Sequence, residues 1–275
     1  MFRSKPLKIT VFVVLVILLV LGGALFFIYL GAPKRFNILI VGSDQRGTER
    51  ARSDVLMIFS IPKSPSQPLS LITIPRDTRV EVPEHGTQKI THAYALGERE
   101  DSSILGNITL TKETVKDFLG IPIHATAEFT FESFKEMVDA FGGVETEQGH
   151  VNGEQALKIV RDRYREGGDF ARTRDQRQIF LELGKKITSI AAAKKLYSFL
   201  GSSNQTRLRY QKTSTYIFGL AAFLRRGGKF NLENTYTEAL PGHGDSIYTP
   251  EFNQKLYYWI ADETAVRILV DKYLR

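Results

Sequence analysis

The chain has 275 residues, of which 43% are hydrophobic and 24% are charged, and it contains no cysteine. This composition is typical of a globular protein and argues against a disordered, collagen-like or low-complexity chain. The lack of cysteine excludes a disulfide framework, a thiolate metal site and a thiol nucleophile. The formal net charge of +7 includes five basic residues and no acidic residue at positions 1–35, so that positions 36–275 carry only +2. A strongly basic, nucleic-acid-binding body is therefore disfavoured.

An apolar segment begins near the N-terminus. Residues 9–30 contain only two clearly polar side chains, Thr10 and Tyr29. As a helix this segment would rise about 33 Å, enough to cross a hydrocarbon core of about 30 Å, and it is longer than the apolar region of a secretory signal. We therefore expect an uncleaved, single-pass transmembrane signal anchor over 9–30. The basic residues before the segment favour a cytoplasmic tail over 1–8 and an extracytoplasmic domain over 36–275, held at the cell membrane.

Several short apolar runs follow. Residues 36–42, 55–61 and 69–74 are nearly continuous in apolar side chains, a pattern typical of strands that are buried on both faces of a sheet. Three prolines and two serines in residues 62–68 predict a loop between the last two strands. A further strand is expected over residues 123–130.

Apolar residues at helical spacing, several of them followed by glycine, predict helices between and after these strands. The expected helices span residues 113–119, 131–141, 153–164, 173–193, 250–260 and 265–273. Strands that alternate with helices indicate the α/β class. We therefore expect a three-layer α/β fold, with a central mixed β-sheet flanked by helices and preceded by the transmembrane helix.

Polar residues gather where the predicted strands begin or end. Asp44 follows the first strand, Asp54 lies at the start of the second, and Arg76 and Asp77 follow the third. Sites in open α/β sheets form outside the strand ends. Further arginines come later in the chain, at positions Arg161, Arg163, Arg172, Arg174 and Arg177.

Each of these residues also has an ordinary structural interpretation. Arginine–aspartate pairs in loops are usually solvated surface pairs that contribute little. Asp44 and Asp54 are equally suited to turns or helix caps. His92 is expected to be a hydrogen-bonded packing residue rather than a catalyst.

Taken together, the groups point to phosphate chemistry. Guanidinium groups bind phosphate oxygens through two parallel hydrogen bonds and stay protonated. Asp44 and Asp54, ten residues apart at neighbouring strand ends, are suited to hold Mg²⁺ with phosphate and water completing its shell. Such parts fit phosphoryl transfer. The sequence lacks a GxxxxGK[ST] loop, an HExxH motif and a GxSxG elbow, which disfavours a nucleotide-driven ATPase and a serine hydrolase.

The motifs, in their order, resemble those of the LytR–CpsA–Psr family of bacterial cell-envelope proteins. The matching stretches cover about half of the body. They are NILIVGSDQR (37–46), ARSDVLMIFSI (51–61), LSLITIPRDTRVEVP (69–83), KITHAY (89–94), TVKDFLGIPI (114–123), FKEMVDAFGGVE (134–145), NGEQALKIVRDR (152–163) and GDFARTRDQRQ (168–178).

This resemblance implies a membrane-anchored phosphotransferase that faces outward. Members are thought to move a glycopolymer, such as teichoic acid or capsular polysaccharide, from an undecaprenyl-pyrophosphate carrier to a muramic acid hydroxyl of peptidoglycan. The product is a phosphodiester, and the lipid phosphate leaves. Mg²⁺ or a similar divalent cation assists, and the polyprenyl chain lies in an apolar tunnel of an α/β domain.

The resemblance also implies roles for individual residues. Asp44 and Asp54 match the family's metal-associated aspartates. The residues that match its catalytic, pyrophosphate-holding cluster are Arg52, Arg76, Arg161, Arg163 and Arg172. The residues that match substrate-binding positions are Arg46, Lys89 and Gln176. Asp54 and Asp77 both remain candidates for the base that takes the acceptor's proton.

The sequence departs from the family pattern in two places. Residues 144–152 form a shorter segment than is common, which affects the expected acceptor site. Asp175 stands where a second arginine is common, and Arg174 or Arg177 would have to compensate.

Three functions remain open at this point. A glycopolymer transferase and a pyrophosphatase acting on polyprenyl pyrophosphate share the same chemistry, because water and a sugar hydroxyl attack the same phosphorus. A non-catalytic protein that binds the lipid carrier, or regulates the envelope, would be expected to have lost the aspartates or arginines. Both aspartates and the main arginines are present, which favours an enzyme.

Overall fold

The computed structural model describes residues 5–44, 51–96, 106–162, 168–187, 189–201, 206–210, 219, 221–222, 232–249 and 253–275. Its centre is a six-stranded sheet in the order β10-β3-β2-β1-β6-β9. The strands are β1 (Arg35–Ser43), β2 (Ser53–Pro62), β3 (Ser70–Thr73), β6 (Ala125–Thr130), β9 (Thr206–Tyr210) and β10 (Tyr236–Ala239). The predicted strands over 36–42, 55–61, 69–74 and 123–130 are confirmed as β1, β2, β3 and β6.

The sheet is mixed, and its strand directions decide where a site can form. β1 is parallel to β6, and β10 is parallel to β3, whereas β2 is antiparallel to both β1 and β3. β9 is antiparallel to β6. The C-terminal ends of β1, β3 and β6 and the start of β2 therefore lie at the same end of the sheet.

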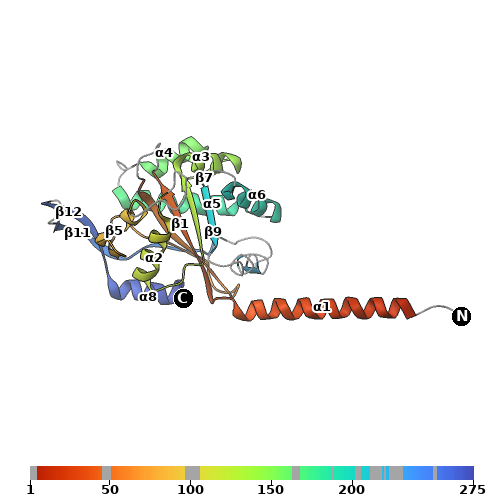
Figure 1. The fold of residues 1–275 in the computed structure, drawn as a ribbon. Helices are drawn as coiled ribbons and strands as arrows, with labels where there is room; N and C mark the ends of the chain where they lie inside the picture. Colours follow the sequence, from red (N-terminus) through yellow and green to blue (C-terminus); the bar gives the residue numbers. More distant parts are fainter. Residues whose placement is uncertain are drawn as a thin grey trace.

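Helices cover both faces of this sheet (Figure 1). They are α2 (Ile108–Leu119), α3 (Phe131–Ala140), α4 (Gly153–Arg161), α5 (Gly168–Lys185), α6 (Ile190–Gly201) and α8 (Glu263–Tyr273). In β2, Leu56 and Ile58 belong to a core that includes α2 and α8, whereas Met57 and Phe59 belong to a core on the other face that includes side chains of α5. This alternation follows from the two-residue period of a strand and confirms the predicted arrangement of helices around a central mixed sheet.

Three small two-stranded sheets surround the central one. They are formed by β4 (Arg79–Val82) with β5 (Gly86–Lys89), β7 (Val144–Thr146) with β8 (Gly149–Val151), and β11 (Gly242–Thr249) with β12 (Gln254–Ala261). The 3₁₀ helix η1 (Ile90–Tyr94) follows β5 directly. The short segment over 144–152 is thus a tight hairpin.

Two of the expected helices are corrected by the structure. The helix predicted over 173–193 is divided into α5 and α6, because Ser189 starts a new helix by accepting the backbone N–H of Ala192 on its hydroxyl at 3.1 Å. The segment predicted as a helix over 250–260 is instead the strand β12 where it is described, paired along its length with β11. Its run of leucine, tyrosine, tryptophan and isoleucine suits a pleated strand better than a helix.

The other helices agree with expectation. The predicted helices over 113–119, 131–141, 153–164 and 265–273 correspond to α2, α3, α4 and α8. Gly120 ends α2 in the left-handed conformation, with φ of 60°, which glycine adopts without the steric cost of a Cβ.

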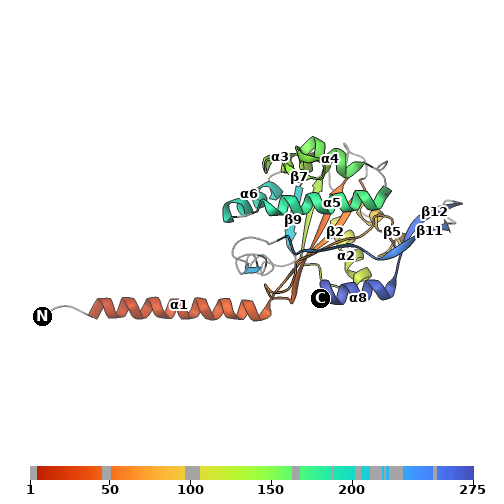
Figure 2. The same cartoon turned by 180° about the vertical axis from the view of Figure 1, so that it is seen from behind.

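Before the sheet, α1 (Lys5–Gly31) extends away from the body (Figures 1 and 2). It covers the segment 9–30. Within the described side chains, which in α1 are those of residues 10–20, 22–23 and 30–31, no helix is long and apolar enough to cross a membrane.

A buried ion pair joins the edge strand β9 to the sheet. Arg207 donates from Nε and Nη2 to the two carboxylate oxygens of Glu128, at 2.8 and 3.0 Å, and the Tyr94 hydroxyl donates to the same carboxylate at 3.1 Å. Glu128 is fully buried. Burial raises the pKa of Glu128 to about 7 even with Arg207 beside it, so without Arg207 the carboxyl is left as an uncompensated buried charge or takes up a proton. Breaking such a buried pair costs about 3–5 kcal/mol.

We therefore expect Arg207→Met to lower the free energy of unfolding by about 3–5 kcal/mol in urea denaturation. The double variant with Glu128→Gln should recover most of this loss, because glutamine is neutral and still accepts the Tyr94 hydrogen bond. Lys116→Met, at an exposed site on α2, serves as the control for a surface change. Equal losses in the single and double variants would contradict the charge argument.

Candidate active site

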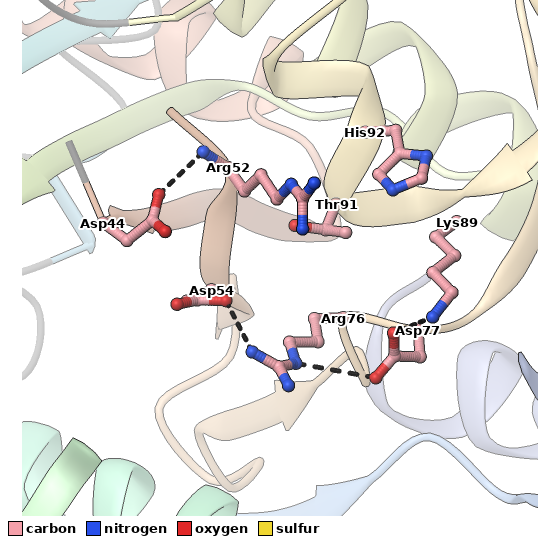
Figure 3. A pocket seen from close by; sticks show the side chains of 8 residues that line it. All are labelled: Asp44, Arg52, Asp54, Arg76, Asp77, Lys89, Thr91 and His92. Carbon is pink, nitrogen blue, oxygen red and sulfur yellow. Dashed lines mark hydrogen bonds and ion pairs between the residues drawn. The ribbon is translucent and has the colours of Figure 1, made fainter. Parts of the chain in front are cut away.

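A cavity of about 220 Å³ lies at the end of the sheet where β1 and β3 finish and β2 begins. Asp44 comes from the end of β1, Asp54 from the start of β2, and Arg76 from the turn after β3. The described residues that line the cavity are Asp44, Arg52, Asp54, Arg76, Asp77, Lys89, Thr91 and His92 (Figure 3). All of the candidate groups that the sequence placed at these strand ends therefore meet in one cavity.

Backbone hydrogen bonds fix the strand ends around the cavity. Asp44 accepts the backbone N–H of Arg52 on its carboxylate at 2.8 Å, and its own N–H donates to the carbonyl of Arg52 at 3.2 Å. Thr91 donates from its hydroxyl to the carbonyl of Ser53 at 2.8 Å, and its N–H donates to the carbonyl of Arg76 at 3.2 Å. The ends of β1, β2 and β3 are thus held together by groups that also line the cavity.

Four charged side chains form a row of ion pairs along the cavity wall (Figure 3). Arg76 Nη1 donates to Asp54 Oδ1 at 2.8 Å, and Arg76 Nε lies 3.5 Å from Asp77 Oδ2. Lys89 Nζ lies 2.7 Å from Asp77 Oδ1. Because these side chains are only 14–20% exposed, water screens their charges less than it would on an open surface. These ion pairs hold the guanidinium of Arg76 between the carboxylates of Asp54 and Asp77.

The β11–β12 hairpin contacts this row of ion pairs at Asp77 and Lys89. The backbone N–H of Trp259 donates to the carbonyl of Asp77 at 2.9 Å, and the indole N–H of Trp259 donates to the carbonyl of Leu240 at 3.2 Å. Lys89 Nζ lies 5.6 Å from the centre of the Tyr258 ring, within range of a cation–π interaction. Sequence reasoning missed this contribution because it assigned the segment to a helix.

His92 is half-buried at the cavity edge, where its Nδ1 lies 3.0 Å from Gln88 Oε1. Burial lowers the pKa of His92, the positive charges of Arg52 and Lys89 lower it further, and Asp77 acts in the opposite direction. The imidazole is therefore neutral at pH 7. Its hydrogen bond agrees with the expected packing role, and its place on the cavity wall adds a neutral donor or acceptor there.

The lowered pKa of His92 makes folding depend on pH. As pH falls below about 6.5, the unfolded chain protonates this imidazole before the folded chain does, so the free energy of unfolding decreases. We expect His92→Gln to make this decrease shallower between pH 7.5 and 5.5 in urea denaturation. An unchanged slope in His92→Gln would contradict the assignment.

Comparison with known proteins identifies the family. The model of the LytR_cpsA_psr family matches residues 30–148 and 145–272. The chain belongs to the LytR–CpsA–Psr family.

Curated relatives in this family cover most of the chain. A protein of Oceanobacillus iheyensis, named polyisoprenyl-teichoic acid–peptidoglycan teichoic acid transferase TagU, is 30% identical over 251 residues, which are 84% of this chain and 73% of the relative. A Bacillus anthracis protein of the same name is 32% identical over 248 residues, 82% of this chain and 74% of the relative.

Solved structures agree with the fold. B. subtilis TagV superposes with a TM-score of 0.65 and 26% identity, covering 86% of this chain and 95% of that chain. TagT bound to LIIa-WTA superposes with a TM-score of 0.64 over 86% of this chain and 89% of that chain; at 21% identity it shows the fold alone.

Three further residues that the LytR–CpsA–Psr resemblance singled out, Arg161, Arg172 and Gln176, are not among the described residues that line the cavity. Arg161 lies over the Phe131 ring at 5.0 Å, just beyond the end of β6. Gln176 is buried and donates to the carbonyl of Val160 at 3.2 Å, which ties α5 to the last turn of α4. Arg172 is buried on α5, one turn before Gln176. Arg46 and Arg163 lie outside the described residues.

Arg174 and Arg177 are the two arginines expected to compensate for Asp175. Arg177 donates from Nη1 to the Thr73 hydroxyl at 3.2 Å, so α5 contacts the end of β3, and burial lowers the pKa of Arg177. Arg174 is exposed, with Nε 3.9 Å from the carboxylate of the buried Asp175. Neither arginine is among the described lining residues of the cavity.

The described lining also shows what kind of metal site is feasible. Among the described residues there is no group of three or more histidine, cysteine, aspartate or glutamate side chains suited to hold a metal ion. Asp44 and Asp54 do share the cavity, and Mg²⁺ is commonly held by one or two carboxylates together with substrate phosphates and water. The side chains therefore fit a divalent cation that binds together with a phosphate group, and not one enclosed by protein ligands.

Proposed function

We propose that this chain is a glycopolymer transferase that joins a polyisoprenyl-linked teichoic acid, or a related envelope polymer, to peptidoglycan. Family membership and the names of the 30–32% identical relatives support the reaction class. In this protein, the observation that supports the proposal most directly is the cavity at the strand ends, which is lined by two arginines, a lysine and three aspartates.

The charges of the cavity suit a pyrophosphate. The lining cations are Arg52, Arg76 and Lys89, and the lining carboxylates balance them with three negative charges. A bound pyrophosphate would add further negative charge. A divalent cation at Asp44 and Asp54, which we propose is Mg²⁺, would offset that charge and polarise the phosphoryl group.

The residues of the chain have distinct tasks in this proposal. The acceptor hydroxyl forms a bond to the phosphorus that carries the polymer, the bond to the bridging oxygen breaks, and polyprenyl phosphate leaves with the electron pair. Arg76, fixed by Asp54 and Asp77, presents a preorganised donor to the phosphate oxygens. In this proposal Asp54 or Asp77, both in the cavity lining, accepts the hydroxyl proton. Arg52, which is exposed, contacts phosphate at the mouth of the cavity.

We also propose that α1 anchors this domain on the outer face of the cell membrane, with the N-terminus in the cytoplasm. The segment 9–30 is apolar by sequence. The side chains of residues 11–20 are 43–77% exposed, and α1 extends away from the body (Figure 2). Exposed apolar surface of this extent is typical of a segment that meets lipid or another apolar partner.

The test of the reaction uses the full chain in a neutral detergent. It is incubated with a polyprenyl-pyrophosphate-linked saccharide, Mg²⁺ and uncrosslinked peptidoglycan oligomers, and the products are identified by mass spectrometry. We expect a saccharide joined to glycan through a phosphodiester, lost when the metal is chelated. Polyprenyl phosphate and saccharide phosphate alone would identify a pyrophosphatase, and binding of the lipid without turnover would identify a carrier-binding protein.

A further inference from the structure

A second cavity of about 220 Å³ lies between α2, strand β6 and the edge strand β9. It shares no lining residue with the active-site cavity. Its lining includes residues 123–126, which lead into the start of β6, whereas the active-site cavity lies beyond the ends of the strands that run parallel to β6. The two cavities therefore lie towards opposite ends of the sheet.

The polar groups of this second cavity are basic or neutral. Lys112 reaches it from α2, Arg209 from β9, and His124 from the segment before β6. Among the described residues, no carboxylate lines it. The described lining thus carries two positive charges, and the carboxylate of Glu128, two residues further along β6 than Thr126, lies within electrostatic range of Arg209.

Thr126 gives an independent sign of a ligand. Its side chain lines the cavity, the residue is only 3% exposed, and its Oγ1 is buried without a hydrogen-bond partner among the described residues. Thr126 is paired with Arg209 across β6 and β9, so the two side chains lie on the same face of the sheet. A buried hydroxyl without a partner is costly, and such groups in native structures usually serve a purpose.

His124 adds a donor of defined orientation. Its Nδ1 accepts the backbone N–H of Asn37 at 3.0 Å, which places the proton of the neutral ring on Nε2. Burial lowers the pKa of His124, so the neutral ring is the form present at pH 7. The cavity therefore combines two cations with a hydroxyl and an imidazole that can both donate.

We propose that this second cavity binds the phosphate group of a ligand, with Lys112 and Arg209 neutralising its charge and Thr126 and His124 donating hydrogen bonds. Phosphate matches this set because it presents several acceptor oxygens around a compact negative charge. Free phosphate and the phosphate of an anionic lipid headgroup share this chemistry. The proposal does not depend on the transferase reaction.

Binding of inorganic phosphate to the full chain in neutral detergent tests the proposal by titration calorimetry. We expect Lys112→Gln and Thr126→Val each to weaken one phosphate-binding event by about tenfold, the effect of losing one charge-assisted or buried hydrogen bond. Lys116→Gln, one turn later on α2 and outside the cavity, should change it less than twofold. Thr126→Val should also unfold at the same or a higher temperature, because it removes a buried hydroxyl without a partner.

A second experiment distinguishes free phosphate from the phosphate of a lipid headgroup as the ligand. Doping the micelles with phosphatidylglycerol should displace inorganic phosphate from this site if a lipid headgroup is the ligand, whereas phosphatidylcholine should not. Unchanged phosphate binding in both micelles would assign the site to a free phosphate. A phosphate isotherm that is the same in wild type, Lys112→Gln and Thr126→Val would overturn the proposal, as would equal losses in Lys112→Gln and Lys116→Gln.

Discussion

Arg76→Lys is expected to lower the rate of polymer transfer by about 10²–10³-fold, the usual cost of removing one preorganised donor at a phosphoryl group. Arg76 reaches Asp54 through Nη1 and Asp77 through Nε, so its planar fork spans two carboxylates. A lysine keeps the positive charge, but its single ammonium cannot reproduce this geometry. The measurement is single-turnover transfer with saturating lipid substrate.

Arg79→Lys is the matched control for this prediction. Arg79 lies three residues later on β4, is exposed, and does not line the cavity. We expect its variant to keep the rate within about twofold, since surface changes away from a site have small effects. Wild-type turnover in Arg76→Lys would show that Arg76 acts only as a diffuse charge.

Asp54→Asn should have the second large effect, a fall in transfer rate of about 10²-fold or more. The substitution keeps the size of the side chain but removes the charge that holds Arg76 at 2.8 Å and that would bind a divalent cation. We therefore also expect the Mg²⁺ concentration for half-maximal rate to rise at least tenfold. A rate assay over a Mg²⁺ titration measures both effects.

Asp117→Asn, on the exposed surface of α2, controls for the loss of one negative charge. Asp54→Ala should be at least as inactive as Asp54→Asn while the chain stays folded by circular dichroism. A variant at position 54 with a normal rate and a normal Mg²⁺ requirement would contradict both roles of this aspartate.

The central strands could be predicted because continuous runs of apolar residues indicate strands that are buried on both faces. β1 and β2 are buried along almost their whole length, so no helical periodicity competes with the strand pattern. The end of β1, the start of β2 and the turn after β3 place Asp44, Asp54 and Arg76 at one end of the sheet, which is why these candidates meet in the structure.

The features that the sequence did not predict depend on contacts with other segments of the chain. β12 is a strand because it pairs with β11, and nothing within residues 254–261 alone reveals that partner. Thr91 and His92 join the cavity because Thr91 bonds to Ser53, 38 residues earlier. The amide of Gln176 donates to the carbonyl of Val160, 16 residues earlier, a contact between α5 and α4 that the sequence did not indicate. Such contacts cannot be found from spacing along the chain.

The most direct test of the account is whether a polyprenyl pyrophosphate binds at the strand ends. Hydrogen exchange of the full chain, followed by mass spectrometry with and without geranylgeranyl pyrophosphate and Mg²⁺, locates the binding site independently of turnover. We predict slower exchange in the segments 75–78 and 89–92, and a weaker effect in Arg76→Lys. Protection confined to other segments, with 75–78 and 89–92 unchanged, would contradict the assignment of this cavity as the active site.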